Sequence, residues 1–497
     1  MIQPPSTVIR NGTIVTAESL TTADLRIEGE RITEIALSIS GRPGDEVVDA
    51  RGLLVLPGGV DPHVHLTRRP SLPTDLLGPE DLTSSSHAAL AGGVTTVGEI
   101  ASPDPAEGVC EVVDRVERDV RSMALVDIFV HPVLGSTTHK ADQVSALPNR
   151  GQPSLKIFLM DPSLAADAAG LRHVVQRAAE AGVTVLFHCE SHEALAEARR
   201  GLLEQRRSSL RFLPESRPKA AEIRATRQAI ALCRDTGATG YIVHISCDEA
   251  LRLCIDARSE GLPIHTETRP EFLHLTAERH RGPDAKLFVI IPPLRDEEDR
   301  HSLWKGVADA SIDVVATDDA GFWSEEQKLA APDTFEDLWM GVSGLELFRP
   351  LLYSEGVVKE RISAERFVEI TSTAAARIFG LFPRKGTIAV GSDADVVLWD
   401  PNLTRTVRSE DMFSRTGFSI YEGRAITGWP TMTFLRGRRV YASGEILGSP
   451  GCGRLIPRSS TGDGTAPKET RRPRAALVTT YDIRTPNVKG EASDAHP

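Results

Sequence analysis

The chain has 497 residues, 40% of them hydrophobic and 25% charged, a balance typical of globular proteins. Its formal net charge of −12 argues against nucleic acid or an anionic membrane as the main partner. The six cysteines show no Cys-x-x-Cys spacing, the first ten residues lack a signal-peptide pattern, and no apolar run approaches the roughly 18 residues of a membrane helix. These features predict a soluble cytoplasmic protein with reduced thiols and no membrane partner.

The first 57 residues are rich in short alternating segments. Residues 7–10, 13–15, 23–27 and 31–35 each have the period-2 pattern of a strand. Asn11-Gly12 stands between the first two segments and favours a hairpin turn there. This part of the sequence therefore predicts a β-rich module.

From about residue 58 the pattern changes to apolar strands separated by stretches of helix length. Helices are predicted at 165–181 and 219–236, among others. Eight strands are predicted at 59–65, 95–100, 126–131, 155–160, 184–189, 241–246, 263–268 and 313–318. An open doubly wound sheet fits the alternation, but eight units favour a closed (β/α)8 barrel of the TIM type.

After residue 380 the β-rich pattern returns, at 386–388, 394–399 and 433–441. Because chain ends often lie close together, we expect one small β-sandwich domain built from residues 1–57 and 380–458. The barrel would then span 58–379. Residues 459–497 are poor in large apolar side chains and predict a tail that is disordered or wraps a neighbouring subunit.

The ends of the predicted barrel strands carry a biased set of side chains. His63 and His65 lie two residues apart on one strand, so alternation turns both imidazoles to the same face. Four other strands contribute Lys156, His188, His244 and Asp318. Barrel enzymes place their chemistry at these strand ends, and imidazole with carboxylate suits zinc and similar divalent ions. The six residues predict a metal site.

Lys156 is set among apolar strand residues, where an unpaired ammonium would be costly. Reaction with CO2 would convert it into an anionic carbamate that is able to bridge two metal ions. Each residue also has an ordinary interpretation: a core or surface histidine, a lysine that is salt-bridged or whose head reaches solvent, or, for Asp318 and Asp319, a helix N-cap. Their joint occurrence at the strand ends of one barrel favours the metal site.

Further motifs lie outside these candidate ligands. They are residues 57–65 (PGGVDPHVH), 292–295 (PPLR), 367–372 (FVEITS), 383–395 (PRKGTIAVGSDAD), 421–423 (YEG) and 427–430 (TGWP). With them the chain resembles the cyclic amidohydrolases of the amidohydrolase superfamily, typified by hydantoinase and dihydropyrimidinase, from residue 7 to about residue 450.

The resemblance implies a site with two metal ions, zinc by expectation. His63, His65 and Asp318 would hold one ion, His188 and His244 the other, and Lys156 would bridge them as N6-carboxylysine. A hydroxide shared by the metals would attack the carbonyl of a cyclic amide, imide or ureide. Asp318 would act as general base and then as general acid. Relatives of this kind are commonly tetramers, so a homo-oligomer, tetramer or dimer, is expected.

The positions that would contact substrate depart from the hydantoinase pattern. Those enzymes carry a tyrosine that stabilises the oxyanion five residues after the lysine, where this chain has Asp161. An aspartate would repel an oxyanion, but it is able to bind a cationic or amide N–H group. The other departures are Ile291 for a serine, Met340 for an asparagine, Asp319 for a histidine, and Arg68 and Arg69 in the loop after the first strand. The two arginines would bind an anionic group, or are simply solvated.

Several other functions are left open by these departures. Allantoinase and dihydroorotase share the metal set, although dihydroorotases usually have an arginine where this chain has Thr67. A divergent hydrolase of another C–N bond is a further alternative. A non-catalytic scaffold such as the collapsin-response mediators is disfavoured, because such proteins typically lack several of the ligands that are intact here.

Overall fold

The computed structural model describes residues 6–67, 80–104, 106–136 and 141–459. These residues belong to one compact unit, Met1–Gly462. The tail predicted from residue 459 lies outside the described residues from 460 onward. No helix in the described ranges combines the length and the apolar character needed to cross a bilayer.

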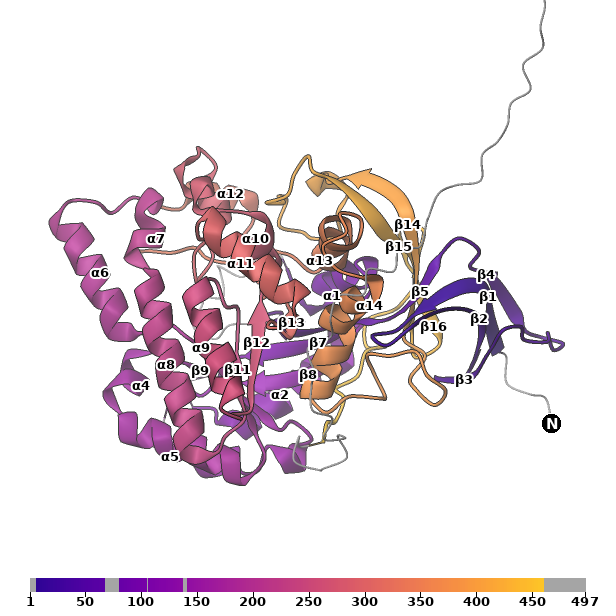
Figure 1. Ribbon diagram of the computed structural model, residues 1–497, viewed down its shortest axis with the longest axis horizontal. Helices are drawn as coiled ribbons and strands as arrows, with labels where there is room; N and C mark the ends of the chain where they lie inside the picture. Colours follow the sequence, from indigo (N-terminus) through magenta and orange to yellow (C-terminus); the bar gives the residue numbers. More distant parts are fainter. Residues whose placement is uncertain (1–5, 68–79, 105, 137–140, 460–497) are drawn as a thin grey trace, which may run out of the picture. The chain divides into compact units, whose positions relative to one another are not determined.

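The largest sheet among the described residues joins the two ends of this unit (Figure 1). Its strand order is β17-β16-β15-β14-β5-β1-β2-β3, with β4 paired to β1. The strands are β1 (Ser6–Val15), β2 (Leu20–Glu28), β3 (Arg31–Ala36), β4 (Glu46–Asp49), β5 (Leu54–Pro57), β14 (Val396–Thr406), β15 (Ala425–Leu435), β16 (Arg438–Ala442) and β17 (Glu445–Ile446). The antiparallel pair of β5 and β14 connects the early strands to the late ones.

The hairpin turn predicted at Asn11-Gly12 is wrong. Both residues lie within β1, where the pairing with β2 shifts its register between Ile9 and Gly12. Asn11 has a φ of 61°, and its N–H donates to the Asp24 carboxylate at 3.0 Å. A positive φ would also suit a hairpin turn, but here Asn11 forms a bulge, because β2 pairs with β1 on both sides of it.

Two parallel sheets contain the remaining strands. One has the order β6-β7-β8, with β6 (Gly59–Val64), β7 (Val94–Ala101) and β8 (Asp127–Pro132). The other has the order β13-β12-β11-β10-β9, with β9 (Ser154–Phe158), β10 (Thr184–His188), β11 (Gly240–Ile242), β12 (Ile264–Thr268) and β13 (Val314–Val315). Isolated parallel bridges between Val133 and Lys156 and between Val64 and Asp319 link the two sheets at both edges.

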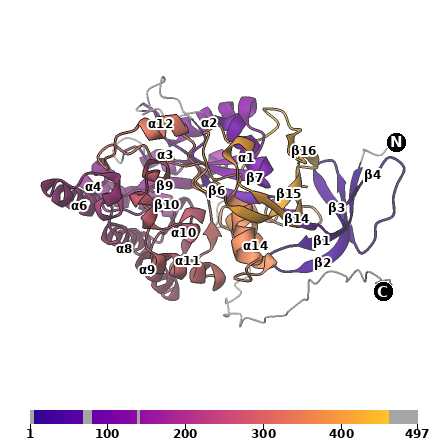
Figure 2. The same ribbon diagram turned by 90° about the horizontal axis from the view of Figure 1, so that it is seen from above.

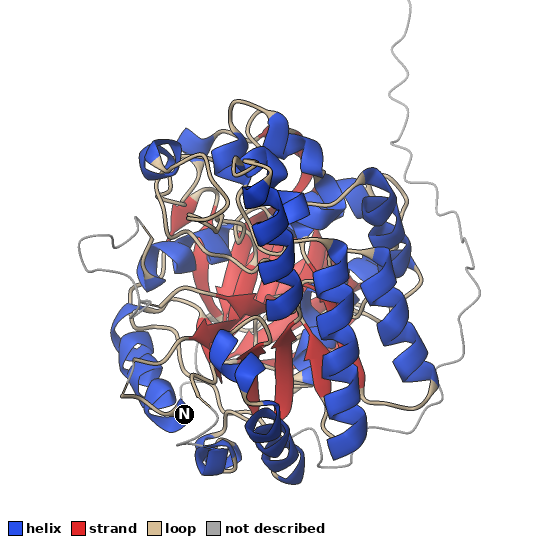
Figure 3. Ribbon diagram, turned by 90° about the vertical axis from the view of Figure 1, so that its left-hand side faces the viewer, coloured by secondary structure: helices blue, strands red, loops and turns tan. Residues whose placement is uncertain are grey.

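Helices surround these parallel strands, as Figures 2 and 3 show. The α-helices are α1 (Leu82–Ala91), α2 (Val109–Met123), α3 (Ala141–Val144), α4 (Pro162–Ala166), α5 (Ala168–Glu180), α6 (His192–Glu204), α7 (Leu213–Ser216), α8 (Lys219–Thr236), α9 (Asp248–Ser259), α10 (Pro270–His274), α11 (Glu297–Ala308), α12 (Glu325–Ala330), α13 (Phe348–Leu352), α14 (Ala364–Val368) and α15 (Ala374–Ile378). Short π-helical turns cover Tyr353–Val357 and Glu369–Thr373, and 3-10 turns cover Pro148–Arg150, Leu210–Phe212, Ala277–Arg281, Ala285–Phe288 and Ser409–Asp411.

The two helices predicted from apolar spacing have different outcomes. The helix predicted at 219–236 is confirmed as α8 with the same bounds. The helix predicted at 165–181 is interrupted at Asp167, whose carboxylate caps α5 by accepting the Gly170 N–H at 2.9 Å. An aspartate that caps a new helix is more favourable than one inside a continuous helix.

A buried ion cluster connects the parallel sheet to the large sheet. The ammonium of Lys385 lies 2.6 Å from Asp127 in β8, 3.0 Å from Asp393 and 2.7 Å from Asp395. Arg436, after β15, forms a second ion pair with Asp127. Burial alone would lower the pKa of Lys385, but the three carboxylates raise it. The positive charge of Lys385 is therefore stabilised by neighbouring carboxylates rather than by solvent.

We predict that Lys385→Met strongly destabilises the fold, by about 3–5 kcal/mol, because it leaves buried carboxylates without their cation. A matched control is Arg31→Met. Arg31 pairs with the same Asp393 at 2.7 Å, but its side chain is 49% exposed. Loss of an exposed partner should cost less than about 1 kcal/mol. Urea unfolding of both variants checks the difference, and equal midpoints would contradict the assigned role of the cluster.

Candidate active site

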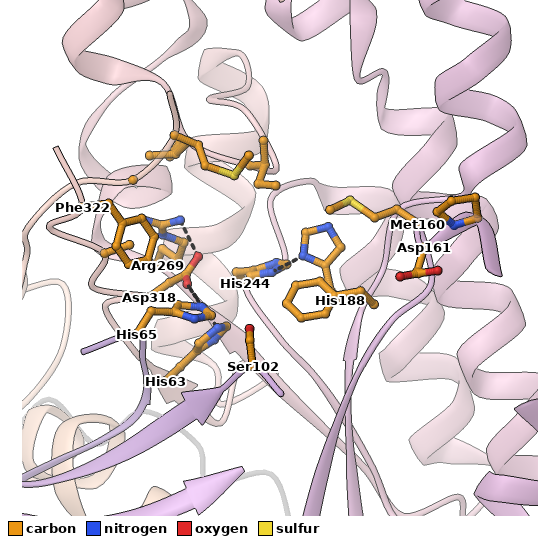
Figure 4. A pocket seen from close by; sticks show the side chains of 17 residues that line it. His63, His65, Ser102, Met160, Asp161, His188, His244, Arg269, Asp318 and Phe322 are labelled. Atoms are coloured by element: carbon orange, nitrogen blue, oxygen red, sulfur yellow. Dashed lines mark hydrogen bonds and ion pairs between the residues drawn. The ribbon is translucent and has the colours of Figure 1, made fainter. Parts of the chain in front are cut away.

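A cavity of about 360 Å³ lies at the carboxyl ends of the parallel strands (Figure 4). This volume is within the range of small-molecule sites. Five of the six predicted metal ligands are in its wall, namely His63, His65, His188, His244 and Asp318. The sixth, Lys156, is fully buried directly behind it. The structure therefore brings all six predicted residues together.

Three of these residues form a compact group on one side of the cavity. The Oδ1 atom of Asp318 lies 3.2 Å from His63 Nε2 and 3.0 Å from His65 Nε2. One ligand atom from each residue lies within 4.8 Å of the others. Two imidazole nitrogens and a carboxylate oxygen at this spacing are a donor set suited to a divalent metal ion.

The other three residues lie next to this group. His188 Nδ1 is 2.9 Å from His244 Nε2, and Lys156 Nζ is 3.5 Å from His63 Nε2. Lys156 forms no ion pair with any residue that the structure describes. Burial lowers the pKa of its ammonium to about 8, against the opposing charges of Asp318 and Glu267. A lysine in these surroundings is held closer to its neutral, nucleophilic form than a surface lysine.

A buried carboxylate fixes the orientation of His63. Glu267 in β12 lies 2.7 Å from His63 Nδ1, and it also accepts hydrogen bonds from the Tyr241 hydroxyl at 2.9 Å and the His244 N–H at 3.0 Å. In the neutral ring Nδ1 carries the proton, so the Nε2 lone pair faces the oxygen of Asp318. A cation between these two atoms would stabilise the arrangement. The sequence analysis missed Glu267, although it stands near the end of a predicted strand.

His188 is held in the same manner by Glu190, which the sequence analysis also missed. Its Nε2 donates to Glu190 at 2.8 Å, and Glu190 forms an ion pair with Arg217 at 2.5 Å. Burial would raise the pKa of Glu190, but Arg217 and His188 lower it to about 2. The Nδ1 lone pair of His188 is left facing His244, again in position for a cation.

His244 and Asp318 were predicted within strands, but both lie after the observed strands have ended. Strands were predicted at 241–246 and 313–318, but β11 ends at Ile242 and β13 at Val315. His244 has a φ of 37° and Asp318 a φ of 50°, in the left-handed region. Such conformations are costly away from glycine and cluster at functional sites. The chain leaves the sheet here, and the left-handed turns bring both side chains to the cavity.

The N-cap interpretation of Asp318 and Asp319 is wrong, because α12 begins only at Glu325 and Ser324 caps it. Asp319 accepts the N–H groups of Gly344 at 2.5 Å and Leu345 at 3.1 Å. Burial raises the pKa of its carboxyl group to about 7. Asp319 thus anchors the 343–345 segment rather than a helix.

Arg269 is a further charged residue of the cavity that the sequence analysis missed. It directly follows β12, and its Nη1 lies 2.7 Å from Asp318 Oδ2 while its Nε lies 3.0 Å from Glu271. Burial would raise the pKa of Asp318, but His63 and Arg269 hold it well below its usual range. Asp318 is therefore ionised, with one oxygen toward the histidines and the other toward Arg269.

The predicted substrate positions are only partly described. Asp161, Ile291 and Met340 all line the cavity. Arg68 and Arg69 lie outside the described residues. Asp161 is also the N-cap of α4, where its Oδ1 accepts the Ser163 N–H at 2.8 Å and the Ser163 hydroxyl at 2.6 Å. This cap gives the aspartate a structural role in addition to any contact with a ligand.

Comparisons with known proteins agree with this geometry. The model of the amidohydrolase family matches residues 54–440. A D-hydantoinase of Ralstonia pickettii is 31% identical over 455 residues, which cover 91% of this chain and 98% of that protein. A D-hydantoinase of Streptomyces coelicolor is 33% identical over 465 residues, with coverage of 91% and 98%. The crystal structure of dihydropyrimidinase from Brevibacillus agri superimposes with a TM-score of 0.87 at 32% identity, over 92% of this chain and 99% of that one.

The cap at Asp161 leads to a stability prediction. Asp161→Ala should lower the free energy of unfolding by about 1 kcal/mol, because the first turn of α4 loses its acceptor. Asp161→Asn keeps a side-chain oxygen and should stay within a few tenths of a kcal/mol of the unchanged protein, roughly the spread among good N-caps. Urea unfolding of the two variants checks this. If the alanine variant were as stable as the asparagine variant, the cap would contribute nothing.

Proposed function

The chain belongs to the amidohydrolase family, and we propose that it is a metal-dependent hydrolase that opens the ring of a cyclic amide, imide or ureide such as a hydantoin or dihydropyrimidine. The observation that carries the proposal is the meeting of His63, His65, Lys156, His188, His244 and Asp318 at one cavity. Relatives named D-hydantoinase, similar over more than nine-tenths of the chain, support the substrate class.

The fold that we propose for this activity is a closed (β/α)8 barrel at residues 58–379 with a β-sandwich domain of residues 1–57 and 380–458. The two isolated bridges at the edges of the parallel sheets support closure, since they complete the cyclic order β6 to β13. A barrel explains why ligands from strands far apart in sequence converge, because the carboxyl ends of parallel strands share one face.

The metal site that we propose holds two divalent ions, most simply Zn²⁺. His63, His65 and Asp318 would bind one ion, and His188 and His244 the other. Two features of the structure support the fit. The carboxylate partners take the N–H groups of the two rings, which leaves a lone pair on His63 Nε2 and on His188 Nδ1. Each of these lone pairs faces an atom of another proposed metal ligand. Carboxylate partners behind histidine ligands are usual at metal sites.

Lys156 would bridge the two ions as N6-carboxylysine. Its neutral amine would attack CO2, forming the N–C bond of a carbamate and releasing one proton. The burial of Lys156 and the lack of an ion pair among the described residues support this assignment. The carbamate would place an anion, instead of an ammonium, beside His63.

The residues of the chain have separable roles in the proposed reaction. Bound metal ions would polarise the scissile carbonyl and increase the acidity of the attacking water. The Asp318 carboxylate would accept a proton from that water and deliver it to the leaving ring nitrogen as the C–N bond breaks. Apolar side chains of the cavity wall, including Phe158, Ile291 and Phe322, would limit the entry of further water. The product is a ring-opened acid.

Asp161 affects which substrates the cavity is expected to bind. It lines the cavity at the position where the resembling enzymes have a tyrosine, and as an anion it would favour a substrate with an N–H or cationic group nearby. Allantoinase or dihydroorotase activity, or hydrolysis of another C–N bond, is the alternative. A non-catalytic scaffold role is the least supported, because all six ligand positions are intact.

The free state of all six cysteines supports a cytoplasmic location, and we expect a homotetramer or homodimer.

The decisive experiment is a substrate panel of hydantoin, dihydrouracil, allantoin, dihydroorotate and a cyclic imide, with ring opening followed by absorbance. We expect turnover of at least one hydantoin or dihydropyrimidine, and activity that is lost on chelation and restored by Zn²⁺. Metal analysis of the purified protein should give close to two ions per chain. Protein with full metal content and no turnover of any member would refute the proposed activity.

Lys156→Ala should lose metal binding and turnover together, because the bridging anion is removed. Lys305→Ala in α11 is the matched control, since Lys305 is exposed and does not line the cavity. A carbamate carbon signal from ¹³C-bicarbonate should appear in the unchanged protein and in Lys305→Ala but not in Lys156→Ala. Retention of both ions by Lys156→Ala would contradict the bridging role.

A further inference from the structure

Arg269 has a hydrogen-bond donor, its Nη2 atom, to which the proposed function assigns no role. The side chain is 2% exposed and lines the cavity beside Asp318 and Phe322 (Figure 4). Its Nε and Nη1 atoms are bonded to Glu271 and Asp318. Its Nη2 atom is buried and has no hydrogen-bond partner among the residues that the structure describes. A buried guanidinium nitrogen without a partner is costly unless a ligand completes it.

The position of Arg269 relative to Asp318 shows which part of a substrate it would meet. The Oδ1 atom of Asp318 faces His63 and His65, whereas its Oδ2 atom contacts Arg269. The guanidinium therefore lies on the side of the carboxylate away from the histidines. A group bound by Arg269 would be displaced from the bond that is cleaved next to the ligand cluster.

The charge of Arg269 indicates the kind of group. Two anions, Glu271 and Asp318, are already paired with this one cation, at 3.0 Å and 2.7 Å. A third anion from a substrate carboxylate would not be balanced by the guanidinium. A neutral acceptor, such as a carbonyl oxygen, would use the remaining N–H groups without adding charge.

Arg269 is also held in a fixed position. The ion pairs with Glu271 and Asp318 restrain two of its nitrogens, and its guanidinium carbon lies 5.9 Å from the centre of the Phe272 ring. Its remaining donors therefore need little rearrangement when a ligand binds, which is the property expected of a specificity group. Asp161, as a carboxylate, offers no donor that would do the same.

We propose that Arg269 is a specificity-determining residue whose guanidinium donates a hydrogen bond to the second ring carbonyl of the substrate, the one that is not hydrolysed. The inference rests on the proposed function and narrows its substrate class. It selects cyclic imides and ureides, which have a second carbonyl, over simple lactams, which have one. No covalent step is assigned to Arg269.

The test compares two ring substrates that differ by one carbonyl, glutarimide and 2-piperidone, and two variants, Arg269→Met and Arg269→Gln. We expect Arg269→Met to lower kcat/KM for glutarimide by roughly 10- to 100-fold, the effect of losing a hydrogen bond from a charged donor. Because loss of the Asp318 contact would slow both compounds, the deciding quantity is the ratio of kcat/KM for glutarimide to that for 2-piperidone, or for the best lactam that is turned over, and this ratio should fall by a factor in that range. Arg269→Gln keeps an N–H donor and should recover part of the preference. If no lactam is measurably hydrolysed, inhibition constants of the two compounds against a good substrate replace kcat/KM.

Controls separate this role from a structural one. Arg281→Met removes an exposed arginine that pairs with Glu278, and it should leave the preference unchanged. Metal content, measured for every variant, should match that of the unchanged protein. Equal losses for both compounds in Arg269→Met, or loss of metal from it, would overturn the inference and leave Arg269 as a support for Asp318. An unchanged protein that opens no ring at all would instead refute the proposed function.

Discussion

The carboxylate of Glu267 is the interaction on which the geometry of the site most depends. It is fully buried, and it binds the ring of His63, the hydroxyl of Tyr241 and the backbone N–H of His244. A buried carboxylate is tolerated only when its oxygens accept such bonds. Because the three donors lie on or next to β6 and β11, one residue of β12 fixes two proposed ligands from two different strands.

Other buried carboxylates hold further proposed ligands in the same way. Glu190, with Arg217 behind it, orients His188, and Asp61 accepts the N–H and hydroxyl of Thr317 at the start of the turn that carries Asp318. Burial raises the pKa of Asp61 to about 7, against the lowering effect of its hydrogen bonds from Thr317 and from the His63 N–H. Four of the six proposed ligands, His63, His188, His244 and Asp318, are thus supported by buried acids that do not line the cavity. These supports define lone-pair directions before any metal ion arrives, which reduces the reorganisation that binding would require.

The sequence predicted the parts of the site that follow from strand periodicity. His63 and His65 could be paired because alternation is a local rule, and Lys156 and His188 lie within β9 and β10 as expected. His244 and Asp318 lie outside the short strands that precede them, in left-handed turns that no periodicity encodes. Glu267 could not be identified as a support, because His63 is distant from it in sequence. Glu190 is only two residues from His188, but their contact depends on the path of the chain after β10 ends, which strand periodicity does not encode. The bulge at Asn11-Gly12 shows the same limit, since only the pairing with β2 decides between turn and bulge.

The residues that set the reaction type and those that set the substrate belong to different parts of this chain. The sequence therefore indicated the reaction type more readily than the substrate. Of the proposed ligands, His63, Lys156 and His188 lie on strands, and His65, His244 and Asp318 lie within three residues after a strand ends. The remaining wall comes from segments after the strands: Asp161 before α4, Arg269 before α10, and Ile291 and Met340 in irregular chain. In Figure 4 Arg269 and Asp161 lie on opposite sides of His244 and His188. An anion and a cation placed apart in this way favour a substrate with hydrogen-bond donors at one end and an acceptor at the other. A cyclic ureide or imide still has a second carbonyl as an acceptor when its first carbonyl is positioned for attack, whereas a simple lactam has only one carbonyl.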